Sequence, residues 1–353
     1  MLTRRRLMGT AGAAAAVTGA AALGAGPARA QARPFTFVSW GGALSATEKE
    51  AFMDPGSKKL GFEIANTSPT TYAKLKAMVE AKAVEWDLVD VGGRFIFQGR
   101  DQGLLEEIDY KIVDASKLEK GWVTSHGVFT SIGATVIAWN TKAFSADRAP
   151  KSWKDFWNVK EFPGARGLYN LLYYNYEAAL LAAGLKKSEI YPATDEKVKQ
   201  AIAKCKELKP HVKVWWTAGA QPPQLLSSGE LAMSSAWSGR ILDAKKESPA
   251  VDMTYKDGIA WGNAYVVPKG TPNKEKAMRL INYCISDEAQ LRLLPVGTYG
   301  PVLASAAAKA DPYQALKLVM HPDNIKDMLI INEEQAAAYS TKHEAAWKQF
   351  QLG

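Results

Sequence analysis

Aromatic side chains gather where the predicted strands of this chain end or where a glycine-rich turn follows. In open α/β sheets, ligands bind at the carboxyl ends of the strands, so side chains at these positions can touch a ligand. A flat aromatic face supplies contact area at a low cost in conformational entropy. The aromatic residues in question are Trp40, Tyr173, Tyr174, Trp216, Trp237, Trp261 and Tyr299. Their positions predict a binding site for a small molecule.

Small or polar residues stand next to several of these aromatics. Gly41 and Gly42 follow Trp40 and let the backbone approach a neighbour closely. Thr217 and Asn263 follow two of the tryptophans and carry polar groups that can orient a ligand. We therefore expect these residues to line the same site.

Two arginines add a positive charge to the predicted site. Arg240 comes three residues after Trp237, and Arg94 follows a Gly-Gly pair at the end of a predicted strand. A guanidinium group binds a carboxylate through two parallel hydrogen bonds and also suits a phosphonate or sulfonate. The predicted ligand is therefore a small solute with an anionic group, such as an amino-acid-like or opine-like compound. Asp90 and Glu177 are the acids placed to accept an amine.

The motifs of common enzyme classes are absent from the sequence. There is no G-x-S-x-G elbow, no H-E-x-x-H, no Walker loop and no G-x-G-x-x-G after the first strand. The four histidines are scattered and lack the spacing of metal ligands. No cluster of Lys and Arg reaches the size of a nucleic-acid footprint. We therefore expect no enzymatic activity, no cofactor, no metal and no nucleic-acid partner.

Alternating strands and helices must position these residues. Three apolar runs are predicted as strands, with a helix between each pair, which is typical of a parallel sheet covered by helices. The strands lie at 35–39, 62–66 and 87–91, and the helices at 44–59 and 70–84. Ser45 and Glu48 are expected to form the capping box of the first helix. A second α/β unit begins with a strand at 133–140.

The first thirty residues have the features of an export signal. Arg4 and Arg5 precede a short stretch rich in Ala and Gly, which ends in an A-x-A site with cleavage expected after Ala30. Paired arginines favour the twin-arginine route, and a standard secretory signal is the alternative. The leader carries four arginines and no acid, so it accounts for half of the formal net charge of +8. We expect the mature protein to work in the periplasm.

Seven pieces of the mature chain resemble one family, the periplasmic solute-binding proteins of ABC importers in their spermidine/putrescine-binding branch. The pieces are the strand that ends at Trp40 and the segments 72–76, 86–89, 132–137, 152–157, 229–234 and 276–283. The resemblance implies an α/β fold of two lobes, each a sheet flanked by helices, which close on a ligand in the cleft between them. Lobe one would comprise 33–138 plus 262–308, and lobe two 139–261 plus 309–353. It also implies a monomer that delivers its solute to an inner-membrane permease.

The resemblance places Trp40, Trp237, Trp261 and Tyr299 at the family's aromatic-box positions, but the family's acids are missing. The paired acids of lobe two align with Leu171 and Tyr174, and Asn263 stands where an Asp follows the late tryptophan. A buried polyamine would lack its charge partners here. The missing acids argue against a polyamine, but the resemblance keeps polyamine binding as one alternative to an anionic solute. Another is ferric-ion binding through Tyr173 and Tyr174, because these residues resemble the adjacent tyrosines of related iron carriers.

Overall fold

The computed structural model describes residues 33–296, 299–311, 314 and 317–353. The export signal expected at residues 1–30 lies outside them. Within the described residues, no helix is both long enough and apolar enough to cross a membrane.

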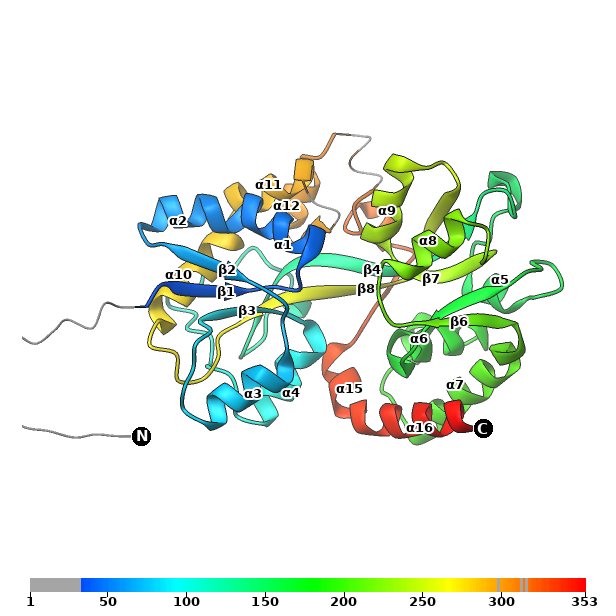
Figure 1. Ribbon diagram of the computed structural model, residues 1–353, viewed down its shortest axis with the longest axis horizontal. Helices are drawn as coiled ribbons and strands as arrows, with labels where there is room; N and C mark the ends of the chain where they lie inside the picture. Colours follow the sequence, from blue (N-terminus) through cyan, green and yellow to red (C-terminus); the bar gives the residue numbers. More distant parts are fainter. Residues whose placement is uncertain (1–32, 297–298, 312–313, 315–316) are drawn as a thin grey trace, which may run out of the picture. The chain divides into compact units, whose positions relative to one another are not determined.

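The first part of the chain forms the predicted parallel strands. β1 (Phe35–Val38) lies between β2 (Ile64–Thr67) and β3 (Leu88–Gly92) and pairs with both in the parallel direction. The helices between these strands cover both faces of the sheet (Figure 1). The parallel sheet expected from the apolar runs is therefore confirmed.

Two long strands run through the middle of the sheet. β4 (Val128–Asn140) and β8 (Val251–Val266) pair with each other in the antiparallel direction, and every residue of β4 is buried. β3 pairs with β8, and β7 pairs with β4, so the sheet has the order β2-β1-β3-β8-β4-β7-β5-β6. The two strands thereby join the elements of both halves of the chain into one hydrogen-bonded sheet (Figure 1).

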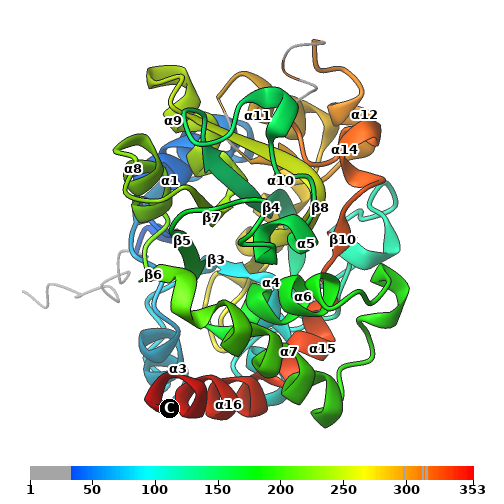
Figure 2. The same cartoon turned by 90° about the vertical axis from the view of Figure 1, so that its right-hand side faces the viewer.

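The second half of the chain adds three more strands. β5 (Arg166–Tyr169) is parallel to both β6 (Val212–Trp216) and β7 (Met233–Trp237). Figure 2 shows α8 (Gln221–Ser227) and α9 (Ser238–Glu247) on one side of these strands. On the other side lie α6 (Leu172–Ala182), α7 (Asp195–Leu208) and α16 (Ser340–Leu352). The predicted α/β class, with helices on both faces of a sheet, is confirmed.

The remaining elements are mostly short. The helices are α1 (Gly42–Glu48), a π-helical turn (Lys49–Met53), α2 (Asp54–Leu60), α3 (Tyr72–Glu80), α4 (Gly93–Asp101), α5 (Trp153–Trp157), α10 (Lys274–Cys284), α11 (Asp287–Val296), α12 (Ala304–Ala307), α14 (Pro322–Ile325) and α15 (Glu333–Ala338). The 3₁₀ turns are Lys120–Trp122, Ala146–Arg148, Lys187–Glu189 and Lys209–His211, and the strands are β9 (Gly300–Pro301) and β10 (Leu329–Ile330).

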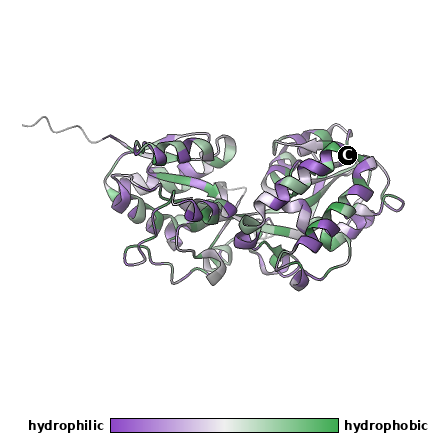
Figure 3. Ribbon diagram, turned by 90° about the horizontal axis from the view of Figure 1, so that it is seen from below, coloured by the Kyte–Doolittle hydropathy of each residue, from purple (hydrophilic) through white to green (hydrophobic). Residues whose placement is uncertain are grey.

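Two large hydrophobic cores stabilise the sheet. One surrounds β1, β3 and the C-terminal end of β8 and includes Leu318 and Met328 from the C-terminal part of the chain. The other surrounds β5 and α6 and includes Trp347 from α16. Hydrophobic and hydrophilic residues alternate along the helices (Figure 3). The division of the chain into two lobes at the expected boundaries stays a prediction.

Both cysteines are free thiols inside these cores. Cys205 lies in α7 and Cys284 ends α10, and neither side chain is exposed. They act as small apolar side chains.

The first predicted helix differs from the expectation. It begins at Gly42, after Gly41 with a φ of 87°, and a π-helical turn divides it from α2. Ser45 Oγ accepts a hydrogen bond from the Gly41 amide at 2.7 Å. The expected capping box is wrong because Glu48 turns inward and accepts hydrogen bonds from Ser39 and Tyr265 instead.

Candidate functional site

Trp261 of β8 is the centre of an aromatic cluster. Its ring centroid lies 5.8 Å from that of Tyr299, 6.0 Å from that of Tyr174 and 6.3 Å from that of Trp237. Tyr169, at the end of β5, extends the cluster, with its ring 6.0 Å from Trp237. Four of the residues predicted from the sequence are thus brought together, and Tyr169 is a member that the sequence prediction missed.

Two residues of β4 fix the position of Trp261. Its indole Nε1 donates a hydrogen bond to Thr135 Oγ1 of β4 at 3.1 Å. Gly133, also on β4, leaves room for the rings, since a Cβ there would lie 2.6 Å from Trp261 and 2.9 Å from Tyr299. The cluster therefore depends on the pairing of β4 with β8 and on the absence of a side chain at residue 133.

A break in the first turn of α6 places the two adjacent tyrosines. Tyr173 has extended backbone angles, and Tyr174 has a φ of 69°, which is unfavourable for a residue with a side chain. The two rings lie 4.1 Å apart as a result. Burial raises the pKa of both phenols well above the ordinary value, which opposes the phenolate form that a ferric ion requires.

Arg94 lies beside these tyrosines in the first turn of α4. Its guanidinium is 4.5 Å from the centroid of the Tyr173 ring, and the Tyr173 hydroxyl donates a hydrogen bond to Glu333 Oε2 at 2.7 Å. Burial raises the pKa of Glu333 to about 8, against the lowering effect of the Tyr173 hydrogen bond. In the described part of the chain, Arg94 forms no ion pair with a carboxylate. Glu333 was not predicted, because its segment shows no motif.

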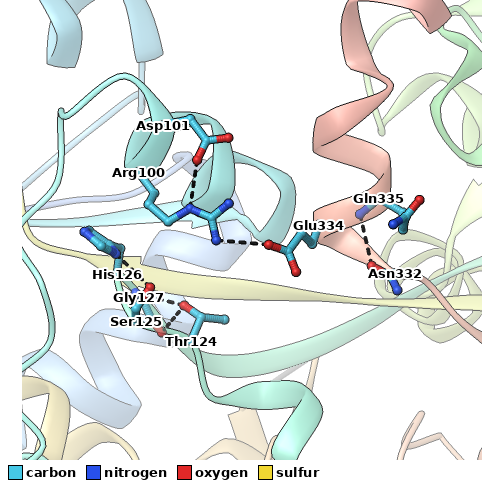
Figure 4. A network of polar contacts seen from close by, with 9 residues as sticks. All are labelled: Arg100, Asp101, Thr124, Ser125, His126, Gly127, Asn332, Glu334 and Gln335. Carbon is cyan, nitrogen blue, oxygen red and sulfur yellow. Dashed lines mark hydrogen bonds and ion pairs between the residues drawn. The ribbon is translucent and has the colours of Figure 1, made fainter. Parts of the chain in front are cut away.

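A polar network holds α15, and with it Glu333, against α4 (Figure 4). The guanidinium of Arg100 donates a hydrogen bond from Nε to Asp101 at 2.8 Å and another to Glu334 Oε1 at 3.0 Å. Asn332 caps α15 by accepting a hydrogen bond from the Gln335 amide at 3.0 Å. The contact between Arg100 and Glu334 joins two helices that are far apart in the sequence.

Arg240 and Trp237 carry buried donors that have no acceptor. Neither Arg240 Nε nor Trp237 Nε1 has a hydrogen-bond partner within the described residues. Both side chains pack near Gly219. A Cβ added there would be 2.4 Å from the Trp237 ring and 3.5 Å from Arg240 Cγ, so the two side chains are neighbours. The Arg240 side chain also lines a groove between α8 and α9 with Asp243.

Trp40 forms a separate aromatic group with Tyr72 of α3. Trp40 is 40% exposed, and its ring meets the Tyr72 ring edge-on with the centroids 5.7 Å apart. Tyr72 stacks in turn on Phe95 of α4 at 3.9 Å. Gly41 and Gly42 both have positive φ and turn the chain after Trp40. Among the described residues, no ring contact joins Trp40 to the Trp261 cluster.

The remaining predicted residues lie at the edge of the cluster or outside it. Trp216 is fully buried behind Trp237, with its ring 5.4 Å away. Thr217 is exposed, and its amide donates a hydrogen bond to Gln221 at 2.8 Å. Asn263 lies within β8, opposite Gly92 of β3. Contact of these three residues with a ligand stays a prediction.

Two buried carboxyls, Glu48 and Asp90, lie outside the aromatic cluster; Asp90 was predicted as an acceptor for an amine, whereas Glu48 was predicted only as part of a capping box. Burial raises the pKa of Glu48 to about 7, although hydrogen bonds from Ser39 and Tyr265 act in the opposite direction. Burial, followed by the charge of Glu48, raises the pKa of Asp90 well above its ordinary value. The pattern Ser45-x-x-Glu48 concealed this role because it matches a capping box.

Comparison with known proteins gives the family. Residues 50–321 match the model of the bacterial extracellular solute-binding proteins. The chain is 36% identical over 314 residues to the gamma-aminobutyric acid-binding protein of Pseudomonas aeruginosa, which covers 88% of each chain. It is 23% identical over 316 residues to the spermidine/putrescine-binding periplasmic protein of Escherichia coli, with 86% of this chain and 88% of that one covered.

Solved structures of similar fold agree. An ABC transporter substrate-binding protein from Bradyrhizobium japonicum superposes with a TM-score of 0.85 at 34% identity, covering 90% of this chain and 99% of that one. The periplasmic binding protein MotA of A. tumefaciens, in complex with glucopine, gives a TM-score of 0.83 at 31% identity, covering 91% of this chain and all of that one. The chain belongs to the bacterial extracellular solute-binding proteins, the solute-binding components of ABC transporters.

Proposed function

We propose that this protein binds a small solute bearing a carboxylate, of the 4-aminobutyrate type, in the periplasm and delivers it to an inner-membrane permease. It acts as a carrier and leaves the solute chemically unchanged. The observation that carries the proposal is a pair of arginines beside the aromatic cluster: Arg240 Nε has no hydrogen-bond partner among the described residues, and Arg94 stacks on Tyr173 next to the buried Glu333.

The unpaired donors favour an anionic ligand on energetic grounds. A buried N–H without an acceptor costs about 1–3 kcal/mol, and native structures rarely leave such groups unpaired. Arg240 Nε and Trp237 Nε1 are two such donors next to each other. A carboxylate has two oxygens that can accept from both, which suits a ligand of this class.

The relatives support the same class of ligand. The Pseudomonas aeruginosa protein is named for gamma-aminobutyric acid, whose carboxylate and ammonium groups stand at opposite ends of a short chain. A polyamine has no carboxylate, and the family resemblance implies that Leu171 and Asn263 stand where the spermidine/putrescine-binding branch carries acids. We therefore expect putrescine to bind more weakly than 4-aminobutyrate.

Closure of two lobes is the proposed mode of binding. In this proposal lobe one comprises residues 33–138 plus 262–308, and lobe two comprises residues 139–261 plus 309–353. Arg94 would then approach the ligand from lobe one, and Arg240 with Trp237 from lobe two. We expect the protein to act as a monomer, since each chain holds a complete set of these residues.

Calorimetry with 4-aminobutyrate tests the proposal. Arg240→Ala should weaken binding by a factor of about thirty or more, because a charge-assisted bond to the carboxylate is lost. Arg94→Ala should act in the same direction. Arg292→Ala is the matched control, because Arg292 is exposed and pairs with Glu288 at 3.5 Å. Unchanged binding in both Arg240→Ala and Arg94→Ala would refute the proposal, as would tighter binding of putrescine to the wild-type protein.

A further inference from the structure

Glu333, the first residue of α15, contacts two other helices beside the aromatic cluster. It is buried, and its Oε2 accepts a hydrogen bond from the Tyr173 hydroxyl of α6 at 2.7 Å. Its other oxygen, Oε1, packs on the first turn of α4, where a Cβ added to Gly93 would lie 2.8 Å from it. One carboxyl thus contacts both the helix that carries Arg94 and the helix that carries the adjacent tyrosines.

Tyr173 connects this carboxyl to Arg94 and to the aromatic cluster. The Arg94 guanidinium lies 4.5 Å from the centroid of the Tyr173 ring, where the cation is attracted to the aromatic face. The Tyr174 ring is 4.1 Å from that of Tyr173 and 6.0 Å from that of Trp261. The hydrogen bond to Glu333 holds the hydroxyl end of the Tyr173 ring. The position of the guanidinium therefore depends on Glu333.

The charge of Glu333 decides how much of the positive charge of Arg94 a solute can use. Burial raises the pKa of Glu333 to about 8, while the hydrogen bond from Tyr173 lowers it. The charge of Glu177 raises this pKa further, and the charge and backbone amide of Arg94 lower it. Burial also raises the pKa of Glu177, to about 7. At pH 7 most of the Glu333 carboxyl is therefore neutral. The other titratable groups around Glu333 and Arg94 are neutral at pH 7 and comprise Tyr72 of α3, Tyr169 of β5, Tyr174 of α6, Tyr191, and His343 of α16.

We propose that Glu333 is a positioning residue for solute binding: through Tyr173 it holds the Arg94 guanidinium for the solute carboxylate, and in its ionised form it competes with that carboxylate for Arg94. This inference rests on the proposed function, which assigns Arg94 to the carboxylate. Two anions near one guanidinium repel each other, so a bound carboxylate opposes the ionisation of Glu333. By linkage, ionised Glu333 weakens solute binding to the same extent. The affinity should therefore fall as the pH rises through about 8, the pKa of Glu333.

The test is calorimetry with 4-aminobutyrate at pH 7 and pH 9, where its primary amine stays mostly charged. The wild-type protein should bind it about threefold or more weakly at pH 9. Glu333→Gln keeps an oxygen that can accept from Tyr173 but cannot ionise, so its affinity should be equal at the two pH values. Glu333→Ala loses the contact with Tyr173 and should bind about threefold or more weakly than Glu333→Gln at both. Glu334→Gln, at an exposed acid that pairs with Arg100, is the matched control and should show the wild-type fall.

The outcomes separate this inference from the proposed function. A wild-type affinity that does not fall at pH 9 overturns the inference, and so does a fall that persists in Glu333→Gln, which would assign it to another group such as Glu177. Equal affinity in Glu333→Ala and Glu333→Gln overturns the positioning role. In each case weaker binding in Arg94→Ala would leave the proposed function standing, whereas a wild-type protein that binds no 4-aminobutyrate overturns both. Should Glu333→Ala fail to fold, Tyr173→Phe replaces it, since it keeps the ring beneath Arg94 and loses only the hydrogen bond.

Discussion

Buried polar atoms carry most of the functional information at the scale of single residues. Arg240, Trp237 and Asp90 each hold a buried polar atom that the described residues leave without an ordinary hydrogen bond. Folding cannot favour such an arrangement for its own sake, because an unpaired buried group lowers stability. The sequence indicated Arg240 and Trp237 through their position after a strand. It could not indicate Glu48 or Glu333, since their burial depends on contacts with distant elements.

Glu333 predicts a pH dependence of stability. Burial raises its pKa to about 8 in the folded protein, whereas the unfolded chain ionises near 4.5. Between these values the folded state binds more protons than the unfolded state, so the free energy of unfolding should fall as the pH rises from about 4.5 to 8. Glu333→Gln should reduce this fall by at least about 1 kcal/mol, as measured by urea unfolding at pH 5 and pH 8.

The neighbouring acid provides the control for this experiment. Glu334→Gln removes the same charge at an exposed position and costs the contact with Arg100. It should therefore leave the difference between pH 5 and pH 8 unchanged. If the Glu333→Gln protein kept the full pH dependence of the wild type, ionisation of Glu333 could not be its cause.

At the scale of elements, the strands were easier to predict than the details of the helices. β1 and β3 are mostly apolar because both of their faces are covered by helices. The π-helical turn after α1 and the break at Tyr173 and Tyr174 could not be predicted, because both serve contacts with residues that are distant in the sequence. Most members of the aromatic cluster could be predicted, because a sequence shows where strands end. Their contacts with one another could not, because the packing between strand ends depends on the whole fold.

Gly133→Ala tests the link between the β4–β8 pairing and the aromatic cluster. The new methyl group would lie 2.6 Å from Trp261 and 2.9 Å from Tyr299, closer than real contacts allow. We expect a loss of about 1–3 kcal/mol in the free energy of unfolding, together with weaker solute binding because Trp261 must move. Gly121→Ala is the control, since a Cβ at Gly121 meets no atom within 4 Å. Equal affinity in the two variants would show that the position of Trp261 is unimportant.

At the scale of the whole molecule, the chain combines one continuous sheet with two hydrophobic cores. β4 and β8 run from one core to the other, so they are the elements about which a relative movement of the two cores would occur. The tryptophans of the aromatic cluster would report such a movement, because indole emission depends on the surroundings of the ring.

Addition of 4-aminobutyrate should therefore change the intrinsic tryptophan fluorescence of the protein. Trp237→Phe should remove much of the change, because its Nε1 is one of the two donors proposed to meet the carboxylate. Trp122→Phe should leave the change in place, since Trp122 packs against Phe129 in the other core. An unaltered signal at a concentration where calorimetry shows saturation would contradict this placement of the ligand.

The two buried cysteines have a practical consequence. Burial raises the pKa of the Cys205 thiol to about 12 and that of Cys284 well above its ordinary value, so neither forms the reactive thiolate readily. These are the only cysteines in the chain. A cysteine introduced at an exposed residue would thus be the one site that a thiol-reactive dye modifies. The native chain is already suited to conversion into a fluorescent sensor for its solute, without prior removal of any thiol.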